Sequence, residues 1–360
     1  MNWLLKFLSV LYGGVVRLRN RLFDKGWLPG TAFRLPVISL GNVTVGGTGK
    51  TPHTEYLLRL LKDSFSLAVL SRGYGRSTRG FVLVKDHPTV EDVGDEPLQM
   101  YRKFPDVPFA VQEKRVPGIQ ELLRMYPKTQ AVLLDDAFQH RYVKPSLSIV
   151  IMDYGRPIYA DRMLPAGRLR EPAEGIRRAD VVVVSKCPPQ MDANKQQEII
   201  DRLPLRPGQQ VFFSTIEYGR LQPACPEQAE SDHFTVNQLC FEGRPVMGFC
   251  GIGAPQPFQQ FVSNIYLTAE CLVFPDHHQY SWRDVDKISE AFERIREKKG
   301  IIVTTEKDYY HLLGNALFEE LLPYIYYVRL EIRFIDNRAD EFNQLVSDHV
   351  RNYPTDSPMA

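Results

Sequence analysis

The chain has 360 residues and a mass of 41.4 kDa, which corresponds to two domains at roughly 150 residues per domain. Its 44 Lys and Arg residues against 43 Asp and Glu residues leave a formal net charge of +1, so the chain lacks the basic excess that indicates nucleic-acid binding. Hydrophobic residues make up 44% and charged residues 24%, which are ordinary values for a folded protein and exclude a wholly disordered chain.

Residues 1–26 predict a basic amphipathic helix. Six apolar residues at alternating spacings of four and three share one helical face, namely Leu4, Leu8, Leu11, Val15, Leu18 and Leu22. Lys6 and Arg17 fall nearly opposite, and such charges interrupt the run of ~20 apolar residues that a bilayer span requires. The basic cluster follows the apolar stretch, so a cleaved signal peptide is not expected. We expect either a helix in a membrane interface or a helix packed on its own domain.

From residue 35 onward, short apolar runs alternate with helical stretches. The runs at 35–40, 67–70, 131–134, 147–152 and 181–184 are rich in Val, Ile and Leu, as in a parallel sheet covered on both faces. With helices such as 54–61 and 119–125 between them, the pattern predicts an α/β, doubly wound fold. A second α/β set begins at 246–250 after a Pro- and Gln-rich segment. We therefore expect the amphipathic helix over 1–26, a first domain over 27–220 and a smaller carboxyl-terminal α/β domain over 221–360.

The strongest motif runs from Gly41 to Thr51 between a predicted strand and a predicted helix. Its end matches the P-loop consensus G-x-x-x-x-G-K-[ST], with Thr44 in place of the first glycine. We expect the backbone of Thr44, Val45, Gly46, Gly47, Thr48 and Gly49 to surround the phosphates of a nucleotide. Lys50 would reach the β- and γ-phosphates of ATP, and the Thr51 hydroxyl would bind Mg²⁺. The alternative is an ordinary glycine-rich turn, but the order of strand, loop and helix favours a P-loop.

Carboxylates are expected near this loop. The predicted strand 131–134 leads directly to Asp135 and Asp136, at a position where carboxylates hold Mg²⁺ directly or through water. Helix capping by one of them is the alternative. Asp95, in Gly94-Asp-Glu-Pro97, either caps a helix or accepts a proton from an attacking hydroxyl.

Other motifs carry charge without indicating one role. Arginines at 72, 76, 168 and 170 lie in turn-like segments and suit either a surface turn or an anionic ligand, since a guanidinium binds two oxygens at once. In the second half, Asp276-His277-His278 follows a predicted strand, where ligands collect in α/β proteins. The segment 305–308, Thr-Glu-Lys-Asp, has no assignable role from its chemistry.

Taken in order, these motifs resemble the tetraacyldisaccharide 4′-kinase family, the lipid A 4′-kinases, over nearly the whole chain. The matching segments are 11–13, 41–42, 45–52, 71–75, 94–97, 135–140, 169–172, 274–277 and 305–308. The resemblance implies phosphorylation by ATP of the 4′-hydroxyl of an acylated glucosamine disaccharide monophosphate, tetraacyldisaccharide 1-phosphate, to give lipid IVA in lipid A biosynthesis. It also implies two α/β domains and a peripheral location at the cytoplasmic face of the bacterial inner membrane.

The resemblance also implies roles for particular residues. It assigns the catalytic carboxylate to Asp95, the P-loop lysine to Lys50, the metal-side acids to Asp135 and Asp136, the active-site histidine to His277, and an arginine to Arg168 or, preferably, Arg170. The implied partners are the lipid substrate and the inner-membrane surface, with no nucleic acid.

Two other functions fit the same P-loop. One is a membrane-associated P-loop NTPase switch or metallochaperone without a small-molecule acceptor, which predicts nucleotide-dependent dimerisation and slow hydrolysis. Such proteins often carry Lys directly before the Gly-Gly pair, where this chain has Val45. The other is a soluble kinase or ligase of a cytoplasmic metabolite, which predicts activity without lipid and without residues 1–26.

Overall fold

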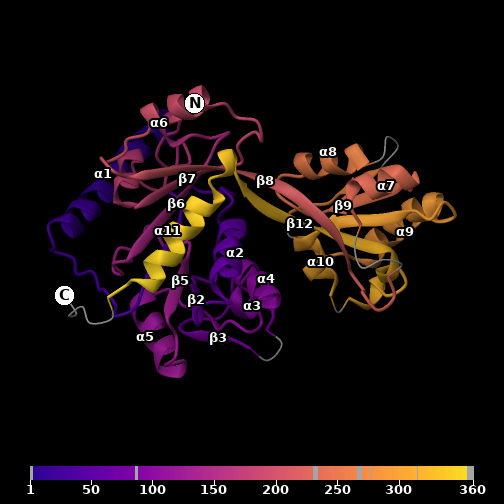
Figure 1. Cartoon of the computed structure of the whole chain (residues 1–360), viewed down its shortest axis with the longest axis horizontal. Coiled ribbons are helices and arrows are strands. Elements are labelled where there is room, and N and C mark those ends of the chain that lie inside the picture. The colour runs from indigo at the N-terminus through magenta and orange to yellow at the C-terminus, as the bar shows by residue number, and fades with distance from the viewer. Residues whose placement is uncertain are drawn as a thin grey trace. The chain divides into compact units, whose positions relative to one another are not determined.

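The computed structural model describes residues 3–85, 88–229, 234–265, 270–276, 278–313 and 315–354, and the chain folds into two compact units (Figure 1). Unit 1 contains the chain up to Ile216 together with the chain from Ile332 onward, and unit 2 contains Glu217–Glu331. The chain enters unit 2 within strand β8 (Gln210–Pro223) and leaves it within strand β12 (Ile325–Phe334).

The expected domain at 221–360 is therefore wrong at its carboxyl end. Helix α11 (Ala339–Arg351) belongs to unit 1, and Figure 1 shows this yellow helix among the indigo and magenta elements of that unit. Its buried face carries Phe342, Val346 and Val350, which join the core that also holds Leu57. Burial of this apolar face in unit 1 explains why the last segment returns there.

The sheet of unit 1 confirms the predicted α/β, doubly wound fold. Its strand order is β8-β7-β6-β1-β5-β2-β4-β3, and all neighbours are parallel except β3 and β4. The strands not yet bounded are β1 (Val37–Gly41), β2 (Leu67–Ser71), β3 (Val82–Val84), β4 (Phe109–Val111), β5 (Ala131–Asp135), β6 (Leu147–Asp153) and β7 (Val181–Ser185). Every residue of β1, β2, β5 and β7 is buried, as expected for strands covered on both faces.

Helices cover this sheet, and α2 (Lys50–Leu61) has its first turn at the carboxyl end of β1. They are α1 (Trp3–Asp24), α2 (Lys50–Leu61), α3 (Val90–Val93), α4 (Asp95–Lys103), α5 (Arg115–Met125) and α6 (Ala193–Arg202), with the 3₁₀ turns η1 (Ile158–Ala160), η2 (Ala173–Arg178) and η5 (Ile335–Asn337). Helix α2 buries Leu57, Leu58 and Leu61. Because Leu61 follows the other two by four and three positions, the three side chains lie on one face of the helix. Its first residue, Lys50, is thereby held at the end of β1.

Unit 2 is a smaller α/β unit with a parallel sheet in the order β10-β9-β11-β12. Its elements are β9 (Val246–Cys250), β10 (Cys271–Val273), β11 (Ile301–Thr305), α7 (Val236–Glu242), α8 (Gln256–Ile265), α9 (Trp282–Arg296), α10 (Glu306–Leu312), η3 (Ala316–Phe318) and η4 (Leu322–Tyr324). Two apolar clusters form its core: one contains Phe258 and Val262 of α8, and the other contains Ile288 and Phe292 of α9.

Helix α1 packs on unit 1 through small and polar residues. Ser9 Oγ donates to the carbonyl oxygen of Met163 at 2.9 Å, and Gly13 is buried beside the same methionine. Arg141 Nη2 lies 2.7 Å from Asp24 Oδ1 near the end of the helix. Among the residues described above, no helix is both long enough and apolar enough to cross a bilayer.

Candidate active site

The predicted phosphate-binding loop joins β1 to α2. Gly49 has φ +92°, and a Cβ atom there would lie 2.8 Å from the Oγ of Ser185, so both the backbone angle and the space favour glycine. A Cβ at Gly41 would lie 2.7 Å from Phe138 Cβ. Helix α2 begins directly after Gly49, and its N-terminus adds the partial positive charge that favours phosphate.

Two threonines of the loop point into the protein. Thr48 is buried and accepts a 2.9 Å hydrogen bond from Asn42 Nδ2, and the buried Thr44 accepts at its carbonyl oxygen from Arg170 Nε at 3.0 Å. The N–H of Val45 donates to the carbonyl oxygen of Arg168 at 2.8 Å. Of the residues predicted to contact nucleotide, these three are therefore arranged to shape the loop, and Val45 does not direct its amide to a phosphate.

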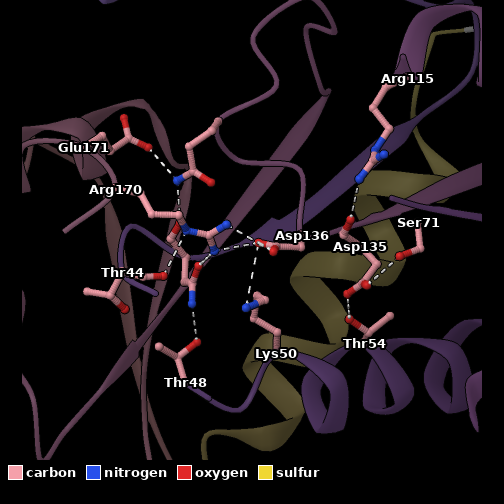
Figure 2. Close-up of polar contacts among 12 residues, drawn as sticks. Thr44, Thr48, Lys50, Thr54, Ser71, Arg115, Asp135, Asp136, Arg170 and Glu171 are labelled. Atoms are coloured by element: carbon pink, nitrogen blue, oxygen red, sulfur yellow. Dashed lines mark hydrogen bonds and ion pairs between the residues drawn. The ribbon is translucent and has the colours of Figure 1, made fainter. Parts of the chain in front are cut away.

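Lys50, Asp136 and Arg170 form the charged centre of the site (Figure 2). Lys50 Nζ lies 3.8 Å from Asp136 Oδ1, and the Arg170 guanidinium binds both Asp136 oxygens at 2.9 and 3.2 Å. Burial raises the pKa of Asp136, but Lys50 and Arg170 outweigh it and hold the pKa below its ordinary value. Asp136 is therefore ionised at neutral pH.

Asp135 has a different environment, although it precedes Asp136 directly. It is buried at the end of β5, and its two carboxyl oxygens accept from Thr54 Oγ1 at 3.2 Å and Ser71 Oγ at 3.1 Å (Figure 2). Burial and the neighbouring Asp136 charge raise its pKa. The buried Arg115 donates to the Asp135 carbonyl oxygen at 3.2 Å, which fixes the backbone where Asp136 takes φ +45°.

Asp95 and Glu96 open α4 beside the loop. A Cβ atom at the preceding residue, Gly94, would lie 2.6 Å from the carbonyl oxygen of Tyr74, so the motifs at 71–75 and 94–97 meet here. The Glu96 side chain bonds Thr51, and desolvation together with the charge of Asp135 raises the pKa of Glu96 to about 7. The sequence analysis assigned Glu96 no role of its own. Its place beside Asp95 in the first turn was the one available signal.

The structure separates the candidate arginines. Arg170 binds Asp136, whereas Arg168 contributes its carbonyl oxygen to Val45, and its N–H donates to Asp161 Oδ1 at 3.2 Å. Arg76 Nη2 pairs with Glu113 at 2.6 Å in a turn of unit 1. Of Arg168 and Arg170, it is therefore Arg170 whose side chain contacts the loop and Asp136, and its role in the reaction stays a prediction.

The histidine motif and the 305–308 segment both lie in unit 2. His277 falls outside the described residues. His278 Nε2 lies 3.1 Å from Asp284 Oδ2, and its ring stacks on Phe274 at 5.0 Å between centroids.

Asp308 explains part of the unassigned 305–308 segment. It is buried and accepts from the N–H of Gly251 and the hydroxyl of Tyr280, both at 2.9 Å, and from Thr305 Oγ1 at 2.6 Å. Thr305 in turn caps α10. Through these contacts, Thr305 and Asp308 hold neighbouring segments of unit 2 together.

The residues at the loop fit Mg²⁺ bound together with a nucleotide. In the described segments, no group of three or more His, Cys, Asp or Glu side chains is placed to hold a metal by itself. Mg²⁺ at phosphate sites takes only one or two carboxylates and completes its octahedron with water and phosphate oxygens. The Thr51 hydroxyl and the carboxylates of Asp135, Asp136 and Glu96 are oxygen donors of this kind.

Comparison with known proteins agrees with this geometry. A family model described as LpxK, tetraacyldisaccharide-1-P 4′-kinase, matches residues 1–351. A tetraacyldisaccharide 4′-kinase of Bacteroides thetaiotaomicron is 46% identical over 357 residues, covering 98% of this chain and 94% of that relative. One of Phocaeicola vulgatus is 42% identical over 355 residues, covering 98% and 96%. The crystal structure of LpxK from Aquifex aeolicus in complex with ATP has a TM-score of 0.72 and 30% identity, covering 95% and 97% of the two chains.

Proposed function

The chain belongs to the tetraacyldisaccharide-1-P 4′-kinase family, and from this premise we propose that it transfers the γ-phosphoryl group of ATP to the 4′-hydroxyl of tetraacyldisaccharide 1-phosphate. The product is lipid IVA, an intermediate of lipid A biosynthesis. The observation that carries the proposal is the cluster of Lys50, Asp136 and Arg170 at a P-loop, in a chain that matches the family over residues 1–351.

Nucleotide binding rests on the loop and on the start of α2. The backbone amides around Gly46 and Gly47 and the N-terminus of α2 supply dipoles for the phosphates. Lys50 and Arg170 supply positive charge where the transferred group carries its negative charge. Phosphoryl transfer depends mainly on such positioning and electrostatic stabilisation.

Asp95 is the proposed proton acceptor for the 4′-hydroxyl. It starts α4 next to Glu96, whose side chain bonds the P-loop residue Thr51, so the helix brings this turn to the phosphate loop. A carboxylate here takes the hydroxyl proton as the oxygen attacks the γ-phosphorus.

Asp135, Asp136 and Thr51 are the proposed Mg²⁺ residues, and Glu96 adds a carboxylate that sequence reasoning did not include. The ion neutralises phosphate charge when it is bound with ATP. Because Asp136 is held ionised by Lys50 and Arg170, this side chain is ready to bind a cation without first losing a proton.

His277 is proposed to act from unit 2, on the strength of the family resemblance. Its neighbour His278 already contacts Asp284 and Phe274 within that unit. At matched melting temperatures, His277→Ala should lower kcat for lipid phosphorylation, and His278→Ala should do so much less. Greater sensitivity at His278 would show that the assignment is displaced by one residue.

The direct test of the function is transfer of label. The protein is incubated with [γ-³²P]ATP, Mg²⁺ and tetraacyldisaccharide 1-phosphate in detergent micelles, and labelled lipid is separated from labelled phosphate. The proposal predicts label on the lipid at the 4′ position. Slow release of phosphate with no labelled lipid, accompanied by nucleotide-dependent dimerisation, would favour the NTPase switch instead.

Association with the inner-membrane surface is proposed for α1. The helix contacts unit 1 through Ser9 and Gly13 and leaves a row of large apolar side chains exposed, including Trp3, Leu4, Phe7, Leu8, Leu11, Val15 and Leu18. A helix that packed only on its own domain would bury such a face. With its basic side chains, α1 has the composition of an interfacial helix.

The test of this surface replaces Leu4, Leu8 and Leu11 with Ser. The variant should move from the vesicle pellet to the supernatant with vesicles containing anionic phospholipid, and its KM for lipid should rise more than its KM for ATP. A matched control, Leu313→Ser, removes an exposed leucine from unit 2 and should leave both unchanged. If the triple variant still pellets with the vesicles and its lipid KM is unchanged, α1 has a structural role only.

A further inference from the structure

Lys186 follows the last residue of β7 and connects the phosphate loop to the end of β6. Its Nζ donates to the carbonyl oxygen of Gly47 in the phosphate loop, and it lies 2.8 Å from Oδ2 of Asp153 at the end of β6. The loop and Lys186 are 139 residues apart in sequence, so the contact exists only in the folded chain. Neither Lys186 nor Asp153 belongs to the motifs identified from the sequence.

The backbone of Lys186 has an unusual conformation. Its φ is +59°, in the left-handed region that residues other than Gly, Asn and Asp rarely adopt. Bonds on both sides hold it there: Tyr154 N–H donates to the Ser185 carbonyl oxygen at 2.9 Å, and Cys187 N–H donates to that of Ser214 at 3.0 Å. A rare conformation that its surroundings enforce is a feature of functional sites.

The loop requires such external support. For its amides to face a phosphate, several of its carbonyl groups must point away and find donors elsewhere. Arg170 Nε binds the Thr44 carbonyl oxygen, and His53 Nδ1 binds that of Gly49 at 2.7 Å. These two contacts hold the two sides of the loop.

Lys186 contacts the middle of the loop, between these two sides. The space beside Gly46 and Gly47 is open, with no atom within 4 Å of where a Cβ would lie, so side-chain packing does not fix the middle of the loop. The ammonium on the Gly47 carbonyl oxygen does so. Because Asp153 balances the charge of Lys186, the contact acts through position more than through added charge.

We infer that Lys186, anchored by Asp153, is a positioning residue for nucleotide binding, which turns the Gly47 carbonyl outward and keeps the adjacent amides directed at the phosphates of the nucleotide. The identity of that nucleotide as ATP rests on the proposed function. The inference assigns Lys186 no contact with the lipid substrate.

The test compares three substitutions in the full-length chain. Lys186→Met removes the ammonium at similar length, Lys186→Asn keeps a residue that tolerates the left-handed backbone, and Lys186→Arg keeps a cation. The measurements are the Kd for ATP by calorimetry and the KM for ATP, KM for lipid and kcat in the labelled-lipid assay. Lys195→Met is the control, because Lys195 is a partly exposed α6 residue paired with Glu198.

The Met and Asn variants should raise the Kd and KM for ATP about tenfold, the change expected on losing one charge-assisted hydrogen bond. Their KM for lipid and kcat should stay within about threefold of wild type. The Arg variant should keep most of the affinity. Asp153→Asn should cause a smaller rise, and adding it to Lys186→Met should add little, because the two residues act as one unit.

The inference is overturned if Lys186→Met binds ATP as wild type does. It is also overturned if the ATP affinity and kcat fall and the lipid KM rises, all together with a lower melting temperature. It is also overturned if Lys186→Asn retains full affinity, since the backbone alone would then suffice. Failure of the wild-type chain to bind ATP or to label lipid would contradict the proposed function instead.

Discussion

Both units place a carboxylate at the end of a buried parallel strand, and the two are used differently. In unit 1, Asp136 follows β5 and faces the cations Lys50 and Arg170. In unit 2, Asp308 lies in the first turn after β11 and accepts hydrogen bonds from neutral groups, among them the Tyr280 hydroxyl. The shared position at a strand end is a consequence of the α/β fold, whereas the tertiary structure decides whether the carboxylate contacts cations or neutral donors.

Asp135 shows that this difference does not follow the division into units. It adjoins Asp136, yet its carboxyl oxygens accept from hydroxyl groups, as those of Asp308 do. Burial raises the pKa of both Asp135 and Asp308, while the cations lower that of Asp136. Substitutions at the two strand ends therefore test whether partner chemistry separates catalytic from structural carboxylates.

The largest effect is expected at Asp95. Removing a proton acceptor with Asp95→Asn should lower kcat for lipid phosphorylation by about 10²–10⁴-fold, with the Kd for ATP nearly unchanged. Asp136→Asn is the comparison: it should weaken the dependence on Mg²⁺ or the affinity for it. If added Mg²⁺ restored Asp95→Asn, the roles of the two carboxylates would have to be exchanged.

Lys50→Ala should have the next largest effect. Loss of a charge that stabilises the transferred group typically costs about 10²–10³ in turnover, and the fold should persist because the Lys50 side chain belongs to no apolar cluster of unit 1. The measurement is turnover at saturating ATP, with circular dichroism as the check on folding. Near-normal turnover in a folded variant would refute the assignment of this loop as the phosphate site.

Asp308→Asn should affect stability and leave catalysis nearly intact. The amide replaces one of the two carboxylate oxygens that accept from the three donors. The free energy of unfolding should therefore fall by about 1–3 kcal/mol, measured by urea titration. Asp286→Asn, at an exposed position on α9, should change it by less than about 0.5 kcal/mol. A more than tenfold fall in kcat with folding retained would show that the strand end of unit 2 also serves the reaction.

The smallest expected effect is a loss of stability toward unfolding at low pH. Burial lowers the pKa of His53, which holds the Gly49 carbonyl, to about 4 from 6.5. As the pH falls, the unfolded chain therefore binds this proton first, and stability is lost from about pH 6.5 down to pH 4. Wild type should lose about 2 kcal/mol more than His53→Gln between pH 7 and pH 5, measured by urea unfolding.

Asp308 should respond in the opposite direction. Burial raises its pKa, so the folded state binds this proton more tightly than the unfolded chain, and its contribution to stability falls as the pH rises above the ordinary value. The wild-type and His53→Gln curves should therefore differ only in the range set by His53. Parallel curves over pH 7 to 5 would show that His53 is not held neutral in the folded chain.

The sequence by itself determined the features that depend on neighbours along the chain. Apolar runs such as 131–134 and the Gly49-Lys50-Thr51 segment follow from strand periodicity and from the backbone freedom of glycine, and both appear in the structure as predicted. The α/β class and the family assignment rest on the same local order of motifs.

The tertiary structure decided which groups those motifs meet. Arg170 reaches Asp136 across 34 residues, Lys186 reaches Gly47 across 139, and the return of α11 to unit 1 depends on a core built from the other end of the chain. Periodicity and spacing carry no information on such pairs, because folding brings them together through strand order and side-chain packing. The partners, and with them the charge states of Asp135 and Asp136, are therefore properties of the folded chain.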